Sequence, residues 1–287
     1  MKFNIKIKRF LIILACITVG SFIISGIILY TTGGISAVSI KTTQIMKSEA
    51  FDAGNVNKLV IKTIDTDISI IPVVDKKISA DFYGNARTNL TGFLPDLKTE
   101  FNNGVLTIEV SYPVTVTLGL INLSRLNLDI YVPDNFSREI ACSSVSGDLE
   151  TRRLELESFT FKSTSGNVNV NELVSENIKI ETTSGKVFIN DLEGSSSIST
   201  ISGGVEADFK SLKKDLNVRT VSGDVDIKIS EEKGFLFSLG SISGNIKNEF
   251  RSKITFADDK NLEGSVGEGV SQVIVKTISG DINLLEK

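Results

Sequence analysis

One short phrase, Ser/Thr-x-Ser-Gly-x-aliphatic, recurs seven times in the second half of the chain. The first six copies are spaced 19, 19, 18, 20 and 21 residues apart, and the last follows after 36, which we interpret as two periods with one degenerate copy. A fixed period of this length indicates a repeat architecture in which similar units stack. The Ser-Gly pairs are Ser146-Gly147, Ser165-Gly166, Ser184-Gly185, Ser202-Gly203, Ser222-Gly223, Ser243-Gly244 and Ser279-Gly280.

The copies, aligned on their glycines, show the same kind of side chain at each position. A Ser or Thr stands three residues before every Gly, and apolar residues stand four and six before almost every Ser. A separation of two is the period of a β-strand, so each copy predicts a strand, a Ser-Gly turn and a second strand. We expect glycine at the turn because it adopts backbone angles closed to other residues. The repeated hydroxyls are expected to bind backbone groups at the turn.

A single unit of this size buries too little apolar surface to offset the conformational entropy lost on ordering. Stacked units share backbone hydrogen bonds and bury both faces, which is the basis of a solenoid. The sequence therefore predicts an all-β parallel β-solenoid with about 19 residues and two strands per coil, rising about 4.8 Å per coil. The alternative is an antiparallel β-sandwich, whose strands also alternate and turn at short intervals.

The repeat reappears, without its glycine, near the beginning of the predicted domain. Residues 62–70 align with 276–284, and further strands are expected at 104–112 and 126–133 between longer irregular stretches. We therefore expect one solenoid domain over 51–287. An irregular coil is expected at 251–270, and an open sheet edge at Ile282–Leu285, next to Glu286 and Lys287, through which copies could associate end to end.

The N-terminal region predicts a membrane anchor. Residues 10–30 carry no charge and are long enough to cross a bilayer as a helix. Four basic residues precede this segment and the next one is Lys41, so positive charge is concentrated on one side. The prediction is a cytoplasmic tail at 1–9, a transmembrane helix at 10–30, a linker at 31–50 and an extracytoplasmic domain.

Two alternatives to the uncleaved anchor stay open. Gly34-Ile35-Ser36 could be a signal-peptide cleavage site, although the apolar segment exceeds the usual length of about 7–15 residues. Cys16 could be a lipoprotein cysteine, although few apolar residues precede it. No disulfide is expected between Cys16 and Cys142, the only cysteines, because Cys142 occupies an inward position of the repeat.

Composition excludes several classes of function. Beyond residue 40 the chain has 27 Lys and Arg against 35 Asp and Glu, so the basic surface typical of nucleic-acid binding is missing. The chain has no histidine, which excludes Ser-His-Asp and Cys-His nucleophilic systems and histidine metal sites. No spacing of carboxylates identifies a glycosidase pair. We predict no catalytic, cofactor-binding or metal-ligating residues, and no cofactor.

The position after the glycine is a candidate calcium ladder, because some β-roll repeats bind Ca²⁺ between coils. Lys186 and Gly204 interrupt the oxygen ligands, and Ca²⁺ requires about six to eight oxygens, so calcium is not expected. The residues of this position are Asp148, Asn167, Lys186, Gly204, Asp224, Asn245 and Asp281.

The repeated Thr-x-Ser-Gly-Asp-apolar phrase, the strand at 128–133 and the Gly267-Glu268-Gly269 segment resemble the DUF4097 family of bacterial β-strand-repeat proteins, also called putative adhesins. The resemblance covers roughly 51–287 and is weaker at Asp65-Thr66 and 251–270. It implies a surface-exposed β-solenoid without established enzymatic activity. It also implies a link, in some members, to envelope-stress systems of Gram-positive bacteria. The family has no agreed functional residues to carry over.

The function predicted is that of a single-pass cell-membrane protein with its N-terminus in the cytoplasm and a non-catalytic, adhesin-like interaction or scaffold module outside. Expected partners are the cytoplasmic membrane through residues 10–30, envelope polymers or envelope proteins, and further copies of the chain at the solenoid ends. The alternative is an accessory regulatory protein of a cell-envelope stress response. An enzyme acting on cell-wall glycan is a third hypothesis.

Overall fold

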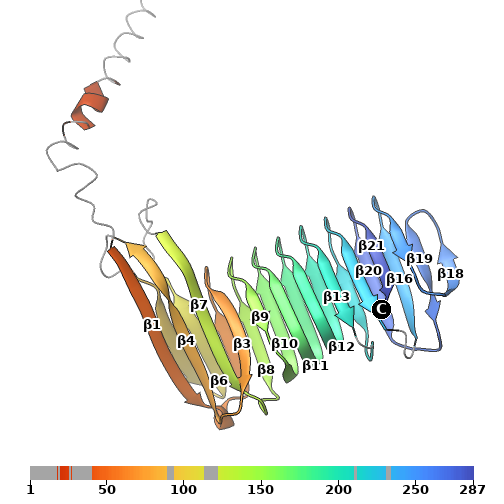
Figure 1. The fold of residues 1–287 in the computed structure, drawn as a ribbon, viewed down its shortest axis with the longest axis horizontal. Helices are drawn as coiled ribbons and strands as arrows, with labels where there is room; N and C mark the ends of the chain where they lie inside the picture. Colours follow the sequence, from red (N-terminus) through yellow and green to blue (C-terminus); the bar gives the residue numbers. More distant parts are fainter. Residues whose placement is uncertain are drawn as a thin grey trace, which may run out of the picture.

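The computed structural model describes residues 18, 20–25, 27, 41–88, 94–112, 122–209, 212–230 and 234–287, and those from 41 onward form an all-β fold (Figure 1). A short 3-10 turn, η2 (Ala53–Asn55), follows the first strand. The strands are β1 (Lys41–Asp52), β2 (Lys58–Lys62), β3 (Asp67–Val73), β4 (Lys77–Thr88), β5 (Asp96–Asn102), β6 (Val105–Ser111), β7 (Asn122–Pro133), β8 (Glu139–Ser143), β9 (Leu149–Thr151), β10 (Leu154–Ser163), β11 (Val168–Thr182), β12 (Val187–Thr200), β13 (Val205–Phe209), β14 (Leu216–Arg219), β15 (Val225–Ile229), β16 (Phe235–Ser241), β17 (Ile246–Asn248), β18 (Lys253–Ala257), β19 (Asn261–Val266), β20 (Gln272–Thr277) and β21 (Ile282–Glu286).

The strands are arranged in two layers that meet at the Ser-Gly turns, here called the corners. The pre-corner sheet contains the strands that lead into the corners, in the order β5-β6-β2-β8-β10-β11-β12-β14-β20-β16-β19-β18. The post-corner sheet has the order β1-β4-β7-β3-β9-β11-β12-β13-β15-β21-β17. Strands β11 and β12 are long enough to take part in both sheets. Neighbouring strands in the central coils run parallel, as predicted.

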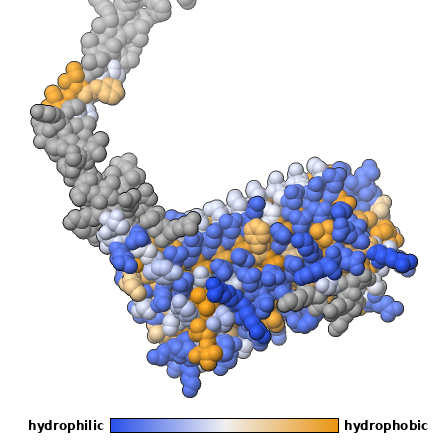
Figure 2. Space-filling model, viewed as in Figure 1, coloured by the Kyte–Doolittle hydropathy of each residue, from blue (hydrophilic) through white to orange (hydrophobic). Residues whose placement is uncertain are grey.

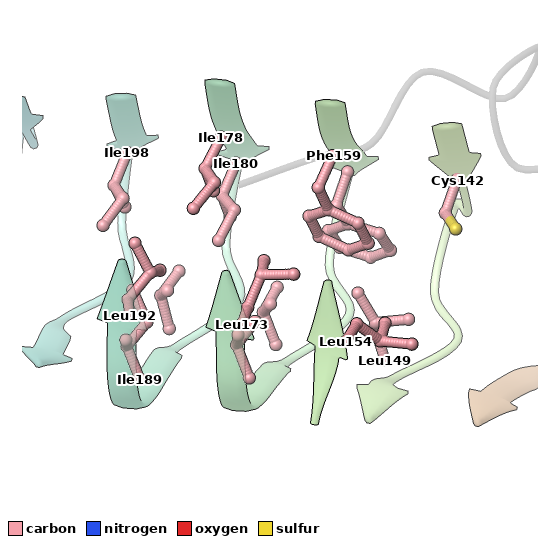
Figure 3. Close-up of a cluster of buried hydrophobic side chains, with 14 of the residues drawn as sticks. Cys142, Leu149, Leu154, Phe159, Leu173, Ile178, Ile180, Ile189, Leu192 and Ile198 are labelled. Atoms are coloured by element: carbon pink, nitrogen blue, oxygen red, sulfur yellow. The ribbon is translucent and has the colours of Figure 1, made fainter. Parts of the chain in front are cut away.

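The inward columns predicted from the repeat form continuous apolar ladders. Phe161 lies beside Cys142 in β8 and beside Ile180 in β11, and all three are buried. Leu154 and Leu173 are paired in the same way on the opposite side of the core, facing the first ladder (Figure 3). Each ladder repeats one side-chain position along the stack, so apolar area is buried between coils as well as between sheets.

The coils bend more often than the sequence predicts. In β11 the buried positions change phase twice, so that this strand contains three straight segments. The first bend lies at Glu172, whose φ of 51° is in the left-handed region, and the corresponding bend of β12 lies at Asp191, with a φ of 62°. The second bend of β11 lies at Glu176-Asn177, where two consecutive residues are exposed. These coils therefore have three segments, where two strands per coil were predicted.

The spatial order of the coils differs from the chain order at both ends. The coil of β2 and β3 is inserted between the β6–β7 coil and the β8–β9 coil. The coil of β20 and β21 is inserted in the same way between the β14–β15 coil and the β16–β17 coil. Figure 1 shows the first exchange as orange β3 beside yellow-green β7.

Two predictions about the C-terminal end are corrected by this arrangement. The open edge predicted at Ile282–Leu285 is wrong, because β21 pairs with β15 on one side and with β17 on the other. The 36-residue interval contains no degenerate coil. It contains instead the antiparallel hairpin of β18 and β19, which pairs with β16.

Antiparallel strands complete the stack at both ends. β4 and β1 continue the post-corner sheet beyond β7, and β5 pairs with β6. β1 begins at Lys41 and buries Ile45, so the sheet extends into the part of the chain predicted as a linker. Among the described strands, those with a partner on one side only are β1, β5, β17 and β18. Antiparallel pairing, which a β-sandwich would show throughout, is thus confined to the ends of the stack.

The corner glycines stack directly on one another. A Cβ on Gly185 would lie 1.8 Å from the carbonyl oxygen of Gly166, and one on Gly203 would lie 1.9 Å from that of Gly185. None of the seven corner glycines has a positive φ, so the expected reason for glycine, its freedom of backbone angle, is wrong. Glycine is required because the carbonyl group of the neighbouring coil occupies the space that a side chain would need.

The hydroxyl three residues before the glycine binds the N–H of that glycine at five of the seven corners, as predicted, whereas Thr277 Oγ1 is buried without a partner among the described residues. Ser163 Oγ accepts a hydrogen bond from the Gly166 N–H at 2.9 Å, and Thr182 Oγ1 accepts one from the Gly185 N–H at 3.1 Å. The equivalent bonds at three other corners are made by Ser144, Thr200 and Ser241. Each of these hydroxyls satisfies a donor inside the turn, where no strand partner is available.

Most of the predicted N-terminal segments lie outside the described residues. These include the cytoplasmic tail at 1–9, most of the segment at 10–30 and the first part of the linker. Residues 20–25 are helical. Within the described part of the chain, no helix combines the length and apolar character needed to cross a membrane.

Replacing Gly203 by Ala is expected to lower the free energy of unfolding by about 3 kcal/mol, because the new methyl group collides with the Gly185 carbonyl. Urea unfolding of the purified full chain measures the effect. The control is Gly204→Ala at the adjacent position, where a Cβ would lie 3.3 Å from its nearest neighbour, the Asp224 carbonyl oxygen. A change of less than about 1 kcal/mol is expected there. Equal effects of the two substitutions would contradict the stacking explanation.

The thiol of Cys142 is expected to be unreactive in the folded protein. Cys142 is only 2% exposed and is flanked by Ile61 and Phe161, and this burial raises the pKa of the thiol well above its ordinary value. A Cys16→Ser variant should therefore resist a thiol-specific reagent at pH 8 and react fully in urea. Rapid labelling without denaturant would show that the inward column opens readily.

Candidate binding surface

The carboxylates that follow the corner glycines bind the backbone of the next coil. Asp148 Oδ1 accepts a hydrogen bond from the Asn167 N–H at 2.7 Å, and Asp224 Oδ1 accepts one from the Asp281 N–H at 2.9 Å. Their oxygens therefore act within the stack. No group of three or more acidic or cysteine side chains able to hold a metal ion occurs in the described ranges.

A shallow groove crosses the outer face of the pre-corner sheet and has a volume of about 540 Å³. It spans β10, β11, β12, β14 and β20. Parallel pairing in register brings its side chains into two rows, because each strand contributes outward residues at the same two positions of the repeat. The hydroxyl and amide side chains of the groove are Ser158, Thr160, Asn177, Ser195, Ser197, Asn217 and Gln272.

Asn217 lies near the middle of the groove and has unused hydrogen-bonding capacity. It is paired in register with Ser197 on one side and Ile274 on the other. Its side-chain oxygen is buried and accepts no hydrogen bond from the residues that the structure describes. This oxygen is enclosed, so a ligand in the groove can reach only the exposed part of the half-buried Asn217 side chain.

Two charged side chains, Lys179 and Asp215, also line the groove. Lys179 lines the groove and forms a 2.8 Å ion pair with Glu181, which also binds Lys162 at 2.8 Å. The hydrogen bonds from Lys162 and then Lys179 lower the pKa of the Glu181 carboxyl, so it stays ionised at neutral pH. Asp215 accepts a hydrogen bond from the Gln272 N–H at 2.9 Å. These charges therefore have partners within the sheet.

The polar side chains of the groove are suited to binding a ligand. Ser, Thr, Asn and Gln side chains both donate and accept hydrogen bonds, which matches a ligand rich in hydroxyl and amide groups. The opposite face of the protein is mostly hydrophilic, as Figure 2 shows for the side carrying the post-corner sheet. We therefore take the groove as the candidate binding surface.

The sequence contains a signal for this groove, which the prediction of no binding residues missed. The outward positions six and eight residues before the corner glycine hold Ser, Thr or Asn in most of the central coils. The inward columns are distinctive because their hydrophobicity repeats, whereas a polar outward position is expected of any exposed strand face. Only the folded sheet shows that these positions adjoin and line a depression.

In comparisons with known proteins, residues 56–285 match the family model described as Toastrack DUF4097. A search of curated proteins returned no significant match. Structural similarity at low identity was found to a putative cell adhesion protein from Clostridium sporogenes, with 12% identity, a TM-score of 0.42, and coverage of 86% of this chain and 100% of that chain.

Two other solved structures have comparable similarity. A putative adhesin from Bacteroides fragilis is 10% identical, with a TM-score of 0.39, covering 84% of this chain and 97% of that one. A putative adhesin from Parabacteroides distasonis is 11% identical, with a TM-score of 0.37, covering 85% and 98%. The family match extends over most of the sequence and includes every Ser-Gly corner, and the chain therefore belongs to the DUF4097 (Toastrack) family.

Proposed function

We propose that this chain is a membrane-anchored, non-catalytic interaction module of the cell envelope, whose groove binds hydroxyl-rich envelope polymers. The observation that carries the proposal is the groove of the pre-corner sheet, with its two rows of hydroxyl and amide side chains. The parallel stack holds these groups at strand spacing on a sheet whose inward side is packed with apolar side chains. A preformed surface of this kind binds an extended polymer with little loss of its own conformational entropy.

The chemistry of the groove supports binding of a polysaccharide or glycan strand. Sugar hydroxyls both donate and accept hydrogen bonds, as do Ser195, Ser197 and Asn177 in the groove. Asn217 adds an amide side chain near the middle of the groove. The groove lies across the strands, so a long ligand can contact several coils at once, and weak contacts add up.

The proposed location follows from the N-terminal sequence. The uncharged segment at 10–30 is long enough to serve as a transmembrane helix, and the basic residues before it favour a cytoplasmic N-terminus. The domain from β1 onward then lies outside the cytoplasmic membrane, where envelope polymers are present.

Binding through the groove is tested with the substitution Asn217→Lys. The full chain in detergent is mixed with purified, insoluble peptidoglycan, and the bound fraction is measured by co-sedimentation. The longer charged side chain blocks the centre of the groove, so the bound fraction should fall at least tenfold. The matched control is Asn169→Lys, at an exposed position on β11 in the post-corner sheet, which should bind like the unchanged chain. Equal binding by the two variants would contradict the proposed groove.

The anchor is tested by fractionation of cells that express the full chain. Alkaline carbonate should leave the chain in the membrane pellet, and deletion of residues 10–30 should release it. Protease added to intact protoplasts should degrade the folded domain, because it faces outward. A chain that carbonate extracts, or one fully protected from the protease, would contradict the proposed location.

A further inference from the structure

The middle residue of each Ser/Thr-x-Ser-Gly phrase lies on the outside of its corner and, with its neighbours, forms a ridge along one edge of the protein. The carbonyl group of each ridge residue before the last accepts a hydrogen bond from the Ser N–H of the next corner, as Ile201 does from Ser222 at 2.7 Å. This bonding fixes the ridge in line. In stacking order its members are Ile64, Val145, Thr164, Thr183, Ile201, Val221, Ile278 and Ile242.

The ridge is aliphatic over its last four positions. The six Ile and Val residues of the ridge are 42–61% exposed, although such side chains are usually inside. Isolated exposed aliphatic residues are common, but a continuous row of Ile201, Val221, Ile278 and Ile242 is a patch, and patches of this kind mark interaction sites.

A cationic groove adjoins this aliphatic end. Its volume is about 550 Å³, and its lining includes Val221, Ile278 and Ile242 together with Arg219, Lys260 and Lys276. No Asp or Glu lines it. None of the three cations has an ion-pair partner among the described residues. This concentration of positive charge occurs in a domain with an excess of acidic residues.

The arrangement of Arg219 and Lys276 is unfavourable for the fold alone. The two residues are direct partners in neighbouring strands, β14 and β20, and like charges in such positions repel. At the same position of the repeat, the β10–β11 pair consists of Lys162 and Glu181, which form an ion pair. The repeat can therefore place opposite charges here, and at the C-terminal end it places two cations.

The domain joins its N-terminal segment on the same edge. β1 begins at Lys41, and its pairing with β4 and β7 places that end on the corner side of the post-corner sheet. Asn127 of β7 is paired with Asp67, which directly follows the first corner. β7 begins five residues earlier, at Asn122, so its start lies beyond that corner. Asn122 pairs with Arg87 of β4, and Arg87 pairs with Thr42 at the start of β1. Figure 1 shows β1 beginning at the upper edge, from which β3 and β13 descend after their corners.

We propose that the cationic groove and the adjoining aliphatic ridge dock on the surface of an anionic lipid bilayer. The aliphatic side chains enter the interface while Arg219, Lys260 and Lys276 bind lipid phosphate groups. An apolar strip beside basic side chains is the usual composition of such surfaces. The proposal rests on the proposed membrane anchor, which would hold this edge towards the bilayer and so favours a membrane over an acidic protein as the occupant.

The chain contains no tryptophan, so a single introduced Trp reports its own surroundings. The full chain carrying Ile278→Trp is reconstituted into lipid nanodiscs whose acyl chains are brominated near the headgroup. With phosphatidylglycerol in the disc, Trp emission should shift to shorter wavelength and be quenched at least twofold. In discs of phosphatidylcholine alone, the quenching should be much weaker. The control is Phe188→Trp, at a residue 40% exposed on the post-corner sheet, which should remain unquenched.

The role of the cations is tested in the same discs with Arg219→Gln and Lys276→Gln. Each change should weaken docking about fivefold. The weakening is measured as a loss of Trp quenching, and this loss should depend on the salt concentration. Three results would each overturn the proposal. The first is equal quenching at positions 278 and 188, and the second is no quenching in anionic discs. The third is an unchanged signal when both Gln substitutions are combined.

A full chain that does not co-purify with the discs would contradict the anchor instead. The Ile278→Trp chain would then be added to brominated vesicles. Quenching with anionic lipid would still support docking, and its absence would overturn it.

Discussion

The close contact between successive corner glycines is the constraint on which the structure depends. The carbonyl oxygen of one glycine occupies the place of the next glycine's missing Cβ, so the coils stack without offset at this edge. In-line stacking brings the inward columns into register and buries them as ladders (Figure 3). The same register aligns the outward columns, and the polar groove and the ridge both result from that alignment. A side chain at any corner would disturb all of these features together.

Both ends of the stack are completed by strands that break the order of the chain. A parallel stack that simply ended would leave open edges able to pair with other copies. Here the first and last coils are inserted one place inward, and antiparallel strands are added outside them. The inserted coils bring together residues far apart in the chain. For example, the Asp281 N–H, just before β21, donates a hydrogen bond to the carboxylate of Asp224, just before β15. Such contacts tie the C-terminus into the interior of the stack.

The repeat separates stability from recognition. Inward positions and corner positions are nearly constant from coil to coil, because packing and the glycine contact restrict them. Outward positions are free to vary, and their variation distinguishes the polar groove of the central coils from the cationic groove at the C-terminal end. The position four residues before the glycine illustrates this, since it holds Lys162 and Glu181 in two neighbouring coils and Arg219 and Lys276 in two others. Function in this fold is therefore expected on the outward columns.

The sequence by itself determined the unit of the fold. Period-two apolar positions such as Phe161 and Ile180, the hydroxyl that binds the corner backbone and the glycine were all readable, because each depends on neighbours within one repeat. The order of the coils was not readable, because every repeat presents nearly the same inward pattern and β20 carries no local mark that selects β14 and β16 as its partners. The reason for the glycine lay in a carbonyl group of another coil. Tertiary structure also decided which outward side chains meet, since Arg219 and Lys276 become neighbours only when the last coil is inserted.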